Sequence, residues 1–358
     1  MADNAPSQPK ITVIVPTCNR AAKIEQCLVG LAAQEYSAFD VIIVDDGSTD
    51  GTPEQVKAFA DAHPQLTVRC LVNETNIGAN PSRNRGIAAA DGEFAAFLDD
   101  DCVPFPEWLR EISTPFDDPT VGVVVGGVYN VPPRNIYELT LKGTQLLPHR
   151  GPAPRILAGN MCVRRQLLLE YGLDEDRQTH AKTASGEIDM SVSGRGDEEG
   201  LYLELKAAGY QALAVPSARV SHDHPHSQRS FLRQAFRGGR SAARLVYKYH
   251  LPQRIDLLPF LAAYGILPLA LWRTPFLWGA LFFFALGIAA IVYNDLFRKR
   301  KTVGEVLLTF PLLLTYYHLR LAGYVKESIG LRIGRNDIKR VDLAFIPRAI
   351  HSDGGSSS

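Results

Sequence analysis

Short apolar runs alternate with amphipathic stretches through the first third of the chain. Ile11 to Val15, Val41 to Val44 and Phe94 to Leu98 are short, apolar and partly β-branched, which is typical of buried strands. Ala21 to Ala33 and Pro81 to Ala90 have the composition and spacing of helices. Strands that alternate with helices through short connections predict an α/β fold with a mostly parallel sheet and right-handed crossovers.

The alternation continues to about Tyr249, where we expect the globular part to end. Val121 to Val128 reads as a Gly/Val-rich strand, and Ile156 to Arg164 as a strand that enters a helix. Val131 to Arg155 contains several prolines and little periodicity, which predicts a long loop or lid. Asp197 to Ala208 is predicted to be a helix.

The chain becomes strongly apolar after this point. Leu257 to Trp272 is apolar but contains prolines, and Phe276 to Tyr293 is a run of 18 uncharged residues, near the lower length for a membrane span. Both would form a membrane hairpin, with the basic cluster Arg298 to Lys301 on the cytosolic side. Val306 to Val325 could span as well or lie in the interface. The alternative is that these segments are core helices of a second soluble domain.

A basic helix is predicted over Ser230 to Arg244, directly before the apolar segments. Its arginines alternate with Phe231 and Phe236, so we expect it to face anionic lipid headgroups rather than nucleic acid. The arginines in and beside it are Arg229, Arg233, Arg237, Arg240 and Arg244.

Charge and cysteine usage narrow the function classes. The 38 Lys and Arg balance the 38 Asp and Glu, so net charge predicts no nucleic-acid partner. The five cysteines are scattered without a Cys-x-x-Cys pair, so neither a disulfide framework nor a zinc site is indicated. Reduced thiols, and a polar N-terminus without an apolar signal core, fit a cytosolic catalytic part.

Four polar motifs lie at the ends of consecutive predicted strands, and they carry the candidate chemistry. In chain order they are Pro16-Thr17-Cys18-Asn19-Arg20, Asp45-Asp46-Gly47-Ser48, Asn76-Ile77-Gly78 running to Arg83-Asn84-Arg85-Gly86, and Asp99-Asp100-Asp101. Strands of an open α/β sheet bind ligands at their carboxyl edge, and adjacent carboxylates attract hard cations such as Mg²⁺ or Mn²⁺. Taken alone, the triple aspartate is equally an acidic turn or a helix cap. No dinucleotide or phosphate-loop glycine motif is present.

With these motifs in this order, the chain resembles the family 2 glycosyltransferases of the GT-A fold over about residues 10 to 245. The resemblance implies a nucleotide diphosphate sugar donor held by the first motifs. Pro16 and Thr17 would contact the base or ribose, with Asn19 and Arg20 in the same motif. Asp46 would accept a hydrogen bond from the base.

The acidic motif would hold the donor's phosphates. By the same resemblance, Arg83 lies near the base and phosphates, Asp99 lies toward the ribose and metal, and Asp101 binds Mn²⁺ or Mg²⁺. Asp100 is the middle residue of this donor site. One of three alternating histidines, His222 foremost, is a further candidate metal ligand, unless they form only a solvated loop.

A second acidic cluster, Gly196 to Leu201, would supply the base. Glu198 takes the position of the family's catalytic aspartate, with Asp197 as second candidate, and Gly200 replaces the family's second acid. Asn160 resembles a residue of the acceptor side, although an ordinary strand-end asparagine is an equal alternative. The polar stretch from 176 to 195 is a candidate lid.

These features predict an inverting, metal-dependent transferase that moves one sugar, with UDP-sugar favoured, to a hydroxyl of a lipid-linked or surface glycan at the cytoplasmic membrane. Gly238 replaces the Trp of the Gln-x-x-Arg-Trp motif in processive relatives, which favours single addition. The expected division is a flexible 1–10, a GT-A domain over 11–249, membrane-associated helices over 250–330 and a tail over 331–358. The alternatives are a polyprenyl-phosphate glycosyltransferase and a non-catalytic sugar-nucleotide-binding scaffold.

Overall fold

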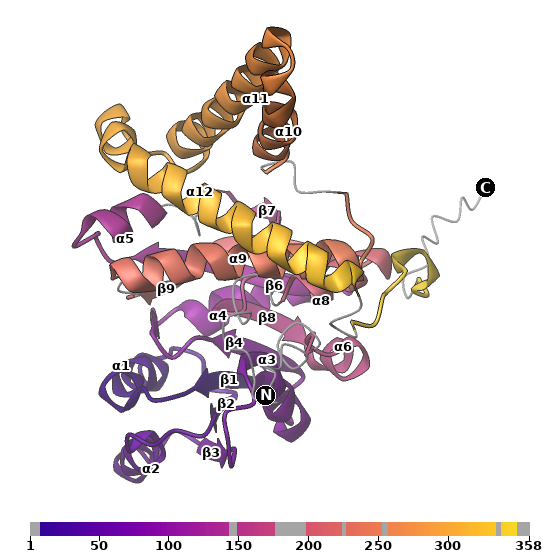
Figure 1. The fold of residues 1–358 in the computed structure, drawn as a ribbon. Coiled ribbons are helices and arrows are strands. Elements are labelled where there is room, and N and C mark those ends of the chain that lie inside the picture. Colours follow the sequence, from indigo (N-terminus) through magenta and orange to yellow (C-terminus); the bar gives the residue numbers. More distant parts are fainter. Residues whose placement is uncertain are drawn as a thin grey trace.

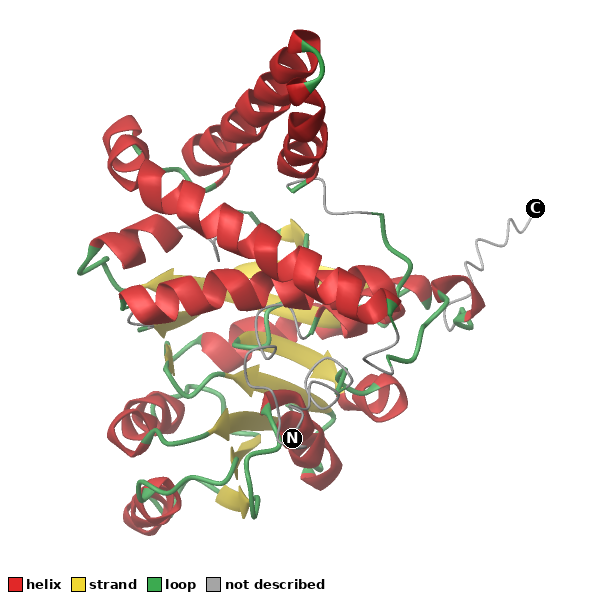
Figure 2. Ribbon diagram, viewed as in Figure 1, coloured by secondary structure: helices red, strands yellow, loops and turns green. Residues whose placement is uncertain are grey.

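The structure is a computed structural model that describes residues 8–142, 149–175, 198–223, 227–252, 257–333 and 338–348. The candidate lid, Asp197, His224 and His226 lie outside these ranges. Figures 1 and 2 show one sheet flanked by helices, with a helical hairpin projecting from one end.

Within the described residues, one mixed sheet of nine strands forms the centre of the molecule. Its order is β3 (Val68–Val72), β2 (Phe39–Asp45), β1 (Ile11–Thr17), β4 (Phe94–Leu98), β8 (Asn160–Arg164), β6 (Val121–Asn130), β9 (Gln211–His222) and β5 (Cys102–Pro104), with β7 (Gly151–Pro152) also pairing with β9.

The expectation of a mostly parallel sheet is wrong for the second half of the domain. β3, β2, β1 and β4 are parallel neighbours, as are β6 and β9, but β8 runs antiparallel between β4 and β6. β5 and β7 are antiparallel to β9. A strand buried on both faces has the same apolar run in either direction, so the pattern does not reveal its orientation.

Helices cover both faces of the sheet and form two hydrophobic cores. Ile11, Val13 and Val15 belong to one core and Ile14 to the other, as the period of a strand requires. The first core includes α1 (Ala21–Ala32), α2 (Thr52–Ala62), α4 (Trp108–Ser113) and the 3₁₀ turn η1 (Thr114–Asp117). The second includes α3 (Ala79–Ala89), α6 (Arg165–Tyr171) and α8 (Glu199–Ala207).

The stretch from 131 to 155, predicted to be a loop or lid, contains regular structure. It holds β7 and the short helix α5 (Ile136–Leu141), whose N-cap Asn135 accepts from the amides of Tyr137 and Glu138 at 3.0 Å. One turn and a half is too short for a hydrophobic period to show in the sequence.

Two long helices lie side by side at the C-terminal end of the domain, α9 (Gln228–Lys248) and α12 (Val303–Arg332) (Figure 1). A methyl group at Gly239 would collide with the carbonyl of Arg320, and one at Gly323 with the carbonyl of Phe236. The two backbones therefore touch where the helices cross, because glycine is the only residue that fits on either side.

A buried ion triad reinforces this crossing. Arg240 Nε donates to Glu327 Oε2 at 2.7 Å, and Arg244 Nε donates to Glu327 Oε1 at 2.6 Å. All three residues are buried, and Arg244 is 0% exposed. The prediction that the arginines of this helix face lipid headgroups is therefore wrong for Arg240 and Arg244, which bind α12.

The projecting hairpin consists of α10 (Leu258–Ile266), the 3₁₀ turn η2 (Leu267–Leu271), α11 (Thr274–Tyr293) and the π-helical turn η3 (Asn294–Arg298) (Figure 1). Among the described residues, 274–298 and 303–332 are long and apolar enough to cross a membrane, by length and composition alone. Much of the hairpin's apolar surface is exposed, including Trp272 and Trp278. After α12, the described tail contains the turn η4 (Leu343–Phe345).

The Arg240–Arg244–Glu327 triad generates a stability prediction. Glu327→Gln removes the carboxylate charge that the two buried guanidinium groups share, which we expect to lower the free energy of unfolding by about 3–5 kcal/mol. Glu305→Gln on the same helix is the matched control: Glu305 pairs with the partly exposed Lys142 and caps its helix, and glutamine keeps the capping role, so we expect a loss of about 0–1 kcal/mol. Denaturant unfolding of the detergent-solubilised chain measures both, and equal losses would contradict the role of the triad.

Candidate active site

The carboxyl ends of β1, β2 and β4 lie together at one edge of the sheet. Thr17 and Asp45 end their strands in register, and Asp99 follows β4 directly. β1, β2 and β4 therefore bring three of the predicted motifs to a common edge, as expected of parallel neighbours.

The two N-terminal motifs are joined by hydrogen bonds. The amide of Asn19 donates to Ser48 Oγ at 2.7 Å, and the amide of Thr49 donates to Asn19 Oδ1 at 2.9 Å. Asn19 has a φ of +54°, a left-handed conformation that asparagine tolerates well. The backbone of the first motif is thereby held in one shape, with Pro16 half-buried and Asn19 exposed.

Asp46 is buried and organises the loop that follows β3. Its Oδ1 accepts from Asn73 Nδ2 at 2.9 Å and from the amide of Ile77 at 2.8 Å, and its Oδ2 accepts from the amide of Gly78 at 2.9 Å. The carboxylate predicted to accept from the base thus fixes the third motif against the second.

Asp99 lies against a buried arginine. Arg83 Nη2 donates to Asp99 Oδ1 at 2.8 Å, and Arg83 Nη1 donates to Asn80 Oδ1 at 3.2 Å. A methyl group at Gly159 would lie 2.5 Å from Asp99 Oδ2, so only glycine leaves room for this carboxylate. Asp99 is the most exposed of the three aspartates, and the Arg83 guanidinium orients it.

Asp100 points back into the domain. Thr17 Oγ1 donates to Asp100 Oδ2 at 2.8 Å, and Arg20 Nε lies 3.7 Å from Asp100 Oδ1. Burial, followed by repulsion from Asp101, raises the pKa of Asp100 to about 7. Arg20 and the Thr17 hydroxyl oppose that rise.

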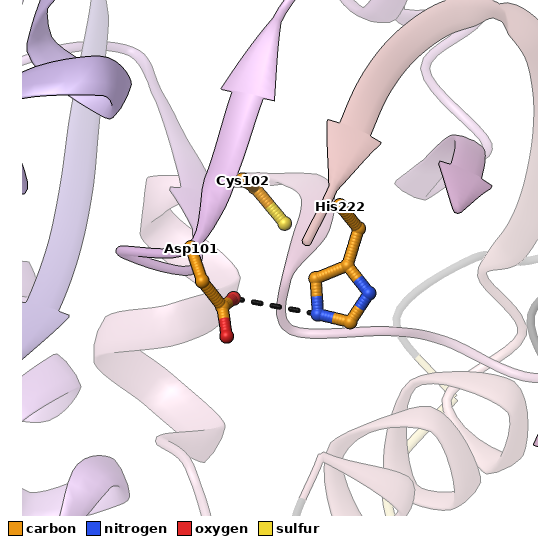
Figure 3. A group of neighbouring side chains, drawn as sticks. All are labelled: Asp101, Cys102 and His222. Atoms are coloured by element: carbon orange, nitrogen blue, oxygen red, sulfur yellow. Dashed lines mark ion pairs between the residues drawn. The ribbon is translucent and has the colours of Figure 1, made fainter. Parts of the chain in front are cut away.

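Asp101 faces His222, whose Nε2 lies 3.3 Å from Asp101 Oδ1 (Figure 3). The antiparallel pairing of β5 with β9 produces this meeting, because Cys102 and His222 are partners in register. Ligand atoms of Asp101, Cys102 and His222 lie within 4.8 Å of one another. Burial raises the pKa of the Cys102 thiol well above its usual value. Hard cations such as Mg²⁺ and Mn²⁺ prefer oxygen ligands to thiolates, so Asp101, with His222 beside it, is the candidate ligand pair. A carboxylate and an imidazole side by side are ligands that fit a divalent cation.

Glu198 immediately precedes α8, at its N-cap position, where the helix dipole stabilises a carboxylate. It is half-buried. The second candidate base, Asp197, lies outside the described residues.

Asn160, predicted on the acceptor side, lies inside the sheet and is 0% exposed. Its Oδ1 accepts from Trp108 Nε1 at 2.7 Å, and its Nδ2 donates to the carbonyls of Gly127 and Ala218, both at 3.0 Å. These bonds tie β8 to β6 and β9. Asn160 can therefore affect an acceptor only indirectly, by fixing the positions of β6, β8 and β9.

Two residues of the edge escaped the sequence analysis. Asn80 is fully buried and links Arg83 to the carbonyl of Asp174, to which its Nδ2 donates at 2.9 Å. Asn73 Nδ2 bridges Asp46 and Ser82, with 2.9 Å to each acceptor. The predicted helix begins at Pro81, but α3 begins at Ala79, which places Asn80 three residues before Arg83 on the same helix. Asn73 has no pattern that distinguishes it.

Parts of the chain are similar in sequence to known glycosyltransferases. The model of the Glycosyl transferase family 2 matches residues 12–156. Glycosyltransferase AglE of Haloferax volcanii is 39% identical over 109 residues, 30% of this chain and 35% of the relative. The pre-mycofactocin glycosyltransferase of Mycobacterium tuberculosis is 29% identical over 258 residues, 69% of this chain and 49% of the relative. The chain thus spans about a third to a half of the length of these curated relatives.

Solved structures share the fold over most of the chain. The mannosyltransferase PcManGT from Pyrobaculum calidifontis, in complex with GDP-Man and Mn²⁺, superposes with a TM-score of 0.56 at 24% identity and covers 89% of this chain and 87% of its own. GalNAc-T7 with UDP, GalNAc and Mn²⁺ has a TM-score of 0.53 at 17% identity over 73% of this chain and 51% of its own. The family match over residues 12–156 and the ordered strand-end motifs identify this part of the chain as a glycosyl transferase family 2 domain, and the solved structures show that the chain has the GT-A fold.

Proposed function

We propose that the chain is an inverting, metal-dependent glycosyltransferase that moves one sugar from a nucleotide diphosphate sugar to a hydroxyl of a lipid-linked or cell-surface glycan. This proposal is carried by the way in which two aspartates of the acidic motif are oriented at the same edge of the sheet. Asp99 accepts a hydrogen bond from Arg83, and Asp101 faces His222. We take a UDP-sugar as the working donor, and structural relatives hold GDP-Man or UDP together with Mn²⁺.

Asp101 and His222 are the residues that would hold the metal, with Asp99 beside them. When bound, Mn²⁺ or Mg²⁺ supplies Lewis-acid stabilisation of the departing nucleotide diphosphate. The motif of Pro16, Thr17, Asn19 and Arg20 and the Asp46-ordered loop would enclose the nucleotide, and the Asp99–Arg83 pair would orient the ribose and phosphates. Asp100 would support this site by holding the side chains of Thr17 and Arg20 in place.

Glu198 is the proposed general base, with Asp197 as the second candidate. A hydroxyl acceptor must lose its proton as it attacks the anomeric carbon opposite the leaving group, and a single carboxylate on that side suffices for inversion. A phosphate acceptor is already anionic and needs no base, so a carboxylate at this position favours a hydroxyl.

The projecting hairpin is the proposed membrane attachment. Exposed apolar residues of α10 to α11, with Trp272 and Trp278 among them, suit a bilayer and its interface. The basic cluster after α11 favours the cytosolic side. Lys299 and Lys301 pair with Asp295 at 2.6 Å, whereas Arg298 and Arg300 are exposed and available to headgroups.

A first prediction concerns the metal ligands. Asp101→Asn and His222→Ala should each weaken Mn²⁺ binding at least about 100-fold, because even outer-shell groups of metal sites are worth 10–100-fold. Thermal shifts with Mn²⁺ plus a panel of nucleotide diphosphates measure this, since linked binding raises thermal stability. Asp61→Asn, on the exposed face of α2, is the control. Unchanged Mn²⁺-dependent shifts in both variants would remove these residues from the metal site.

A second prediction concerns the base. Glu198→Gln should lower sugar transfer by about 10²–10⁴-fold, the usual contribution of general base catalysis, while Mn²⁺-dependent nucleotide binding is retained. Glu199→Gln, the adjacent carboxylate, should transfer nearly normally. The reverse order of these two effects would exclude Glu198 as the base.

The raised pKa of Asp100 predicts a pH-dependent stability. Its folded-state pKa of about 7 lies above the ordinary 3.8, so the folded state binds the proton more tightly and metal-free stability falls as pH rises from about 4 to 7. Asp100→Asn should remove this loss. Compared with the wild type, the metal-free variant should be more stable at pH 8 by a few kcal/mol, as an order of magnitude, and should show no such gain at pH 4. Denaturant unfolding in chelator at both pH values measures the effect against Asp61→Asn. A wild-type pH slope in Asp100→Asn would contradict it.

A further inference from the structure

A concave site lies beside α8, and its lining residues are outside the nucleotide motifs. It is a cavity of about 180 Å³ between the end of α6, one face of α8 and the end of α9, and its walls include Asp174, Leu201, Glu204, Lys248 and Tyr249. Sites for drug-sized ligands measure about 300–1,000 Å³, so this cavity admits a group about the size of one sugar ring.

The wall of this cavity depends on Gly200, the position where this chain lacks the family's second acid. A methyl group at Gly200 would collide with the hydroxyl of Tyr249. That hydroxyl donates to Glu204 Oε1 at 2.8 Å, one helical turn further along α8. The loss of a side chain at position 200 therefore makes room for a tyrosine and glutamate pair that faces the cavity.

The charges of the cavity favour a neutral, hydroxyl-rich ligand over a phosphate. Lys248 Nζ donates to Asp174 Oδ1 at 2.7 Å, so the ammonium is already neutralised by a buried carboxylate. Glu175 and Glu204 add two further carboxyl groups to the same walls. Burial raises the pKa of Glu204, which indicates that its carboxylate is poorly solvated and gains from a hydrogen-bond donor.

The cavity is connected to the donor edge. The carbonyl of Asp174 accepts from Asn80 Nδ2 at 2.9 Å, Asn80 accepts from Arg83, and Arg83 donates to Asp99. On the opposite wall, Leu201 lies three residues after Glu198, which is nearly one helical turn. Hydrogen bonds thus link one wall of the cavity to the residues proposed for the donor, and α8 links the other wall to the residue proposed as base.

We propose that this cavity binds a neutral sugar unit of the acceptor, with Glu204 and Tyr249 as specificity-determining residues. Glu204 accepts hydrogen bonds from the sugar hydroxyls, and Tyr249 holds the Glu204 carboxylate in place. The inference rests on the proposed function, since it gives that function's acceptor a location.

The test is ligand-observed NMR of the detergent-solubilised full chain with the methyl glycosides of glucose, galactose, mannose and N-acetylglucosamine. At least one glycoside should bind, and inorganic phosphate should not displace it. Glu204→Gln and Tyr249→Phe should weaken that binding about tenfold or more, and Gly200→Ala should do the same by displacing the Tyr249 hydroxyl. Tyr202→Phe is the matched control, because Tyr202 lies on the same helix but donates to the carbonyl of Ala153 at 3.1 Å, outside the cavity walls.

Thermal shifts with Mn²⁺ and nucleotide diphosphates, run on the same samples, separate the two proposals and show that each variant is folded. Retained nucleotide binding with no glycoside binding, or with equal glycoside binding in all variants, overturns the acceptor site alone. Displacement of the glycoside by phosphate also overturns it. Absence of any nucleotide binding in the parent chain overturns the proposed function.

Discussion

Repulsion among three adjacent carboxylates is the constraint on which the acidic edge of the sheet depends. Asp99, Asp100 and Asp101 follow one strand, and the fold separates them by giving each a different partner. Arg83 comes from a helix, Thr17 from a neighbouring strand, and His222 from a strand on the far side of the sheet. The three carboxylates therefore have different chemical environments, although they are consecutive identical residues in the sequence.

The first half of the domain was predictable because its chemistry is local. Apolar runs such as Phe94 to Leu98 carry their polar motifs at their ends, and parallel neighbours bring those ends to one edge. The position of Asp99 therefore followed from the pattern alone. The orientation of Asp100 into the domain did not, since it depends on the hydroxyl of Thr17, 83 residues away.

The remainder depends on pairings that no short pattern encodes. His222 meets Asp101 through the register of two antiparallel strands, and their orientation is not readable from composition. Arg240 and Arg244 were predicted to face lipid headgroups, because the acid that pairs with them, Glu327, lies more than 80 residues later in an apolar helix. Asn160 followed a strand pattern, yet its fully buried amide joins three strands.

The crossing of α9 and α12 has a consequence for the reach of the enzyme. Two glycines and a shared carboxylate hold the backbones in direct contact, and α12 is joined to the hairpin through η3. If the hairpin attaches to a bilayer as proposed, this fixed crossing would hold the acidic edge at one height above the lipid surface. The enzyme would then select acceptors by the distance of their reactive group from the membrane as well as by their chemistry.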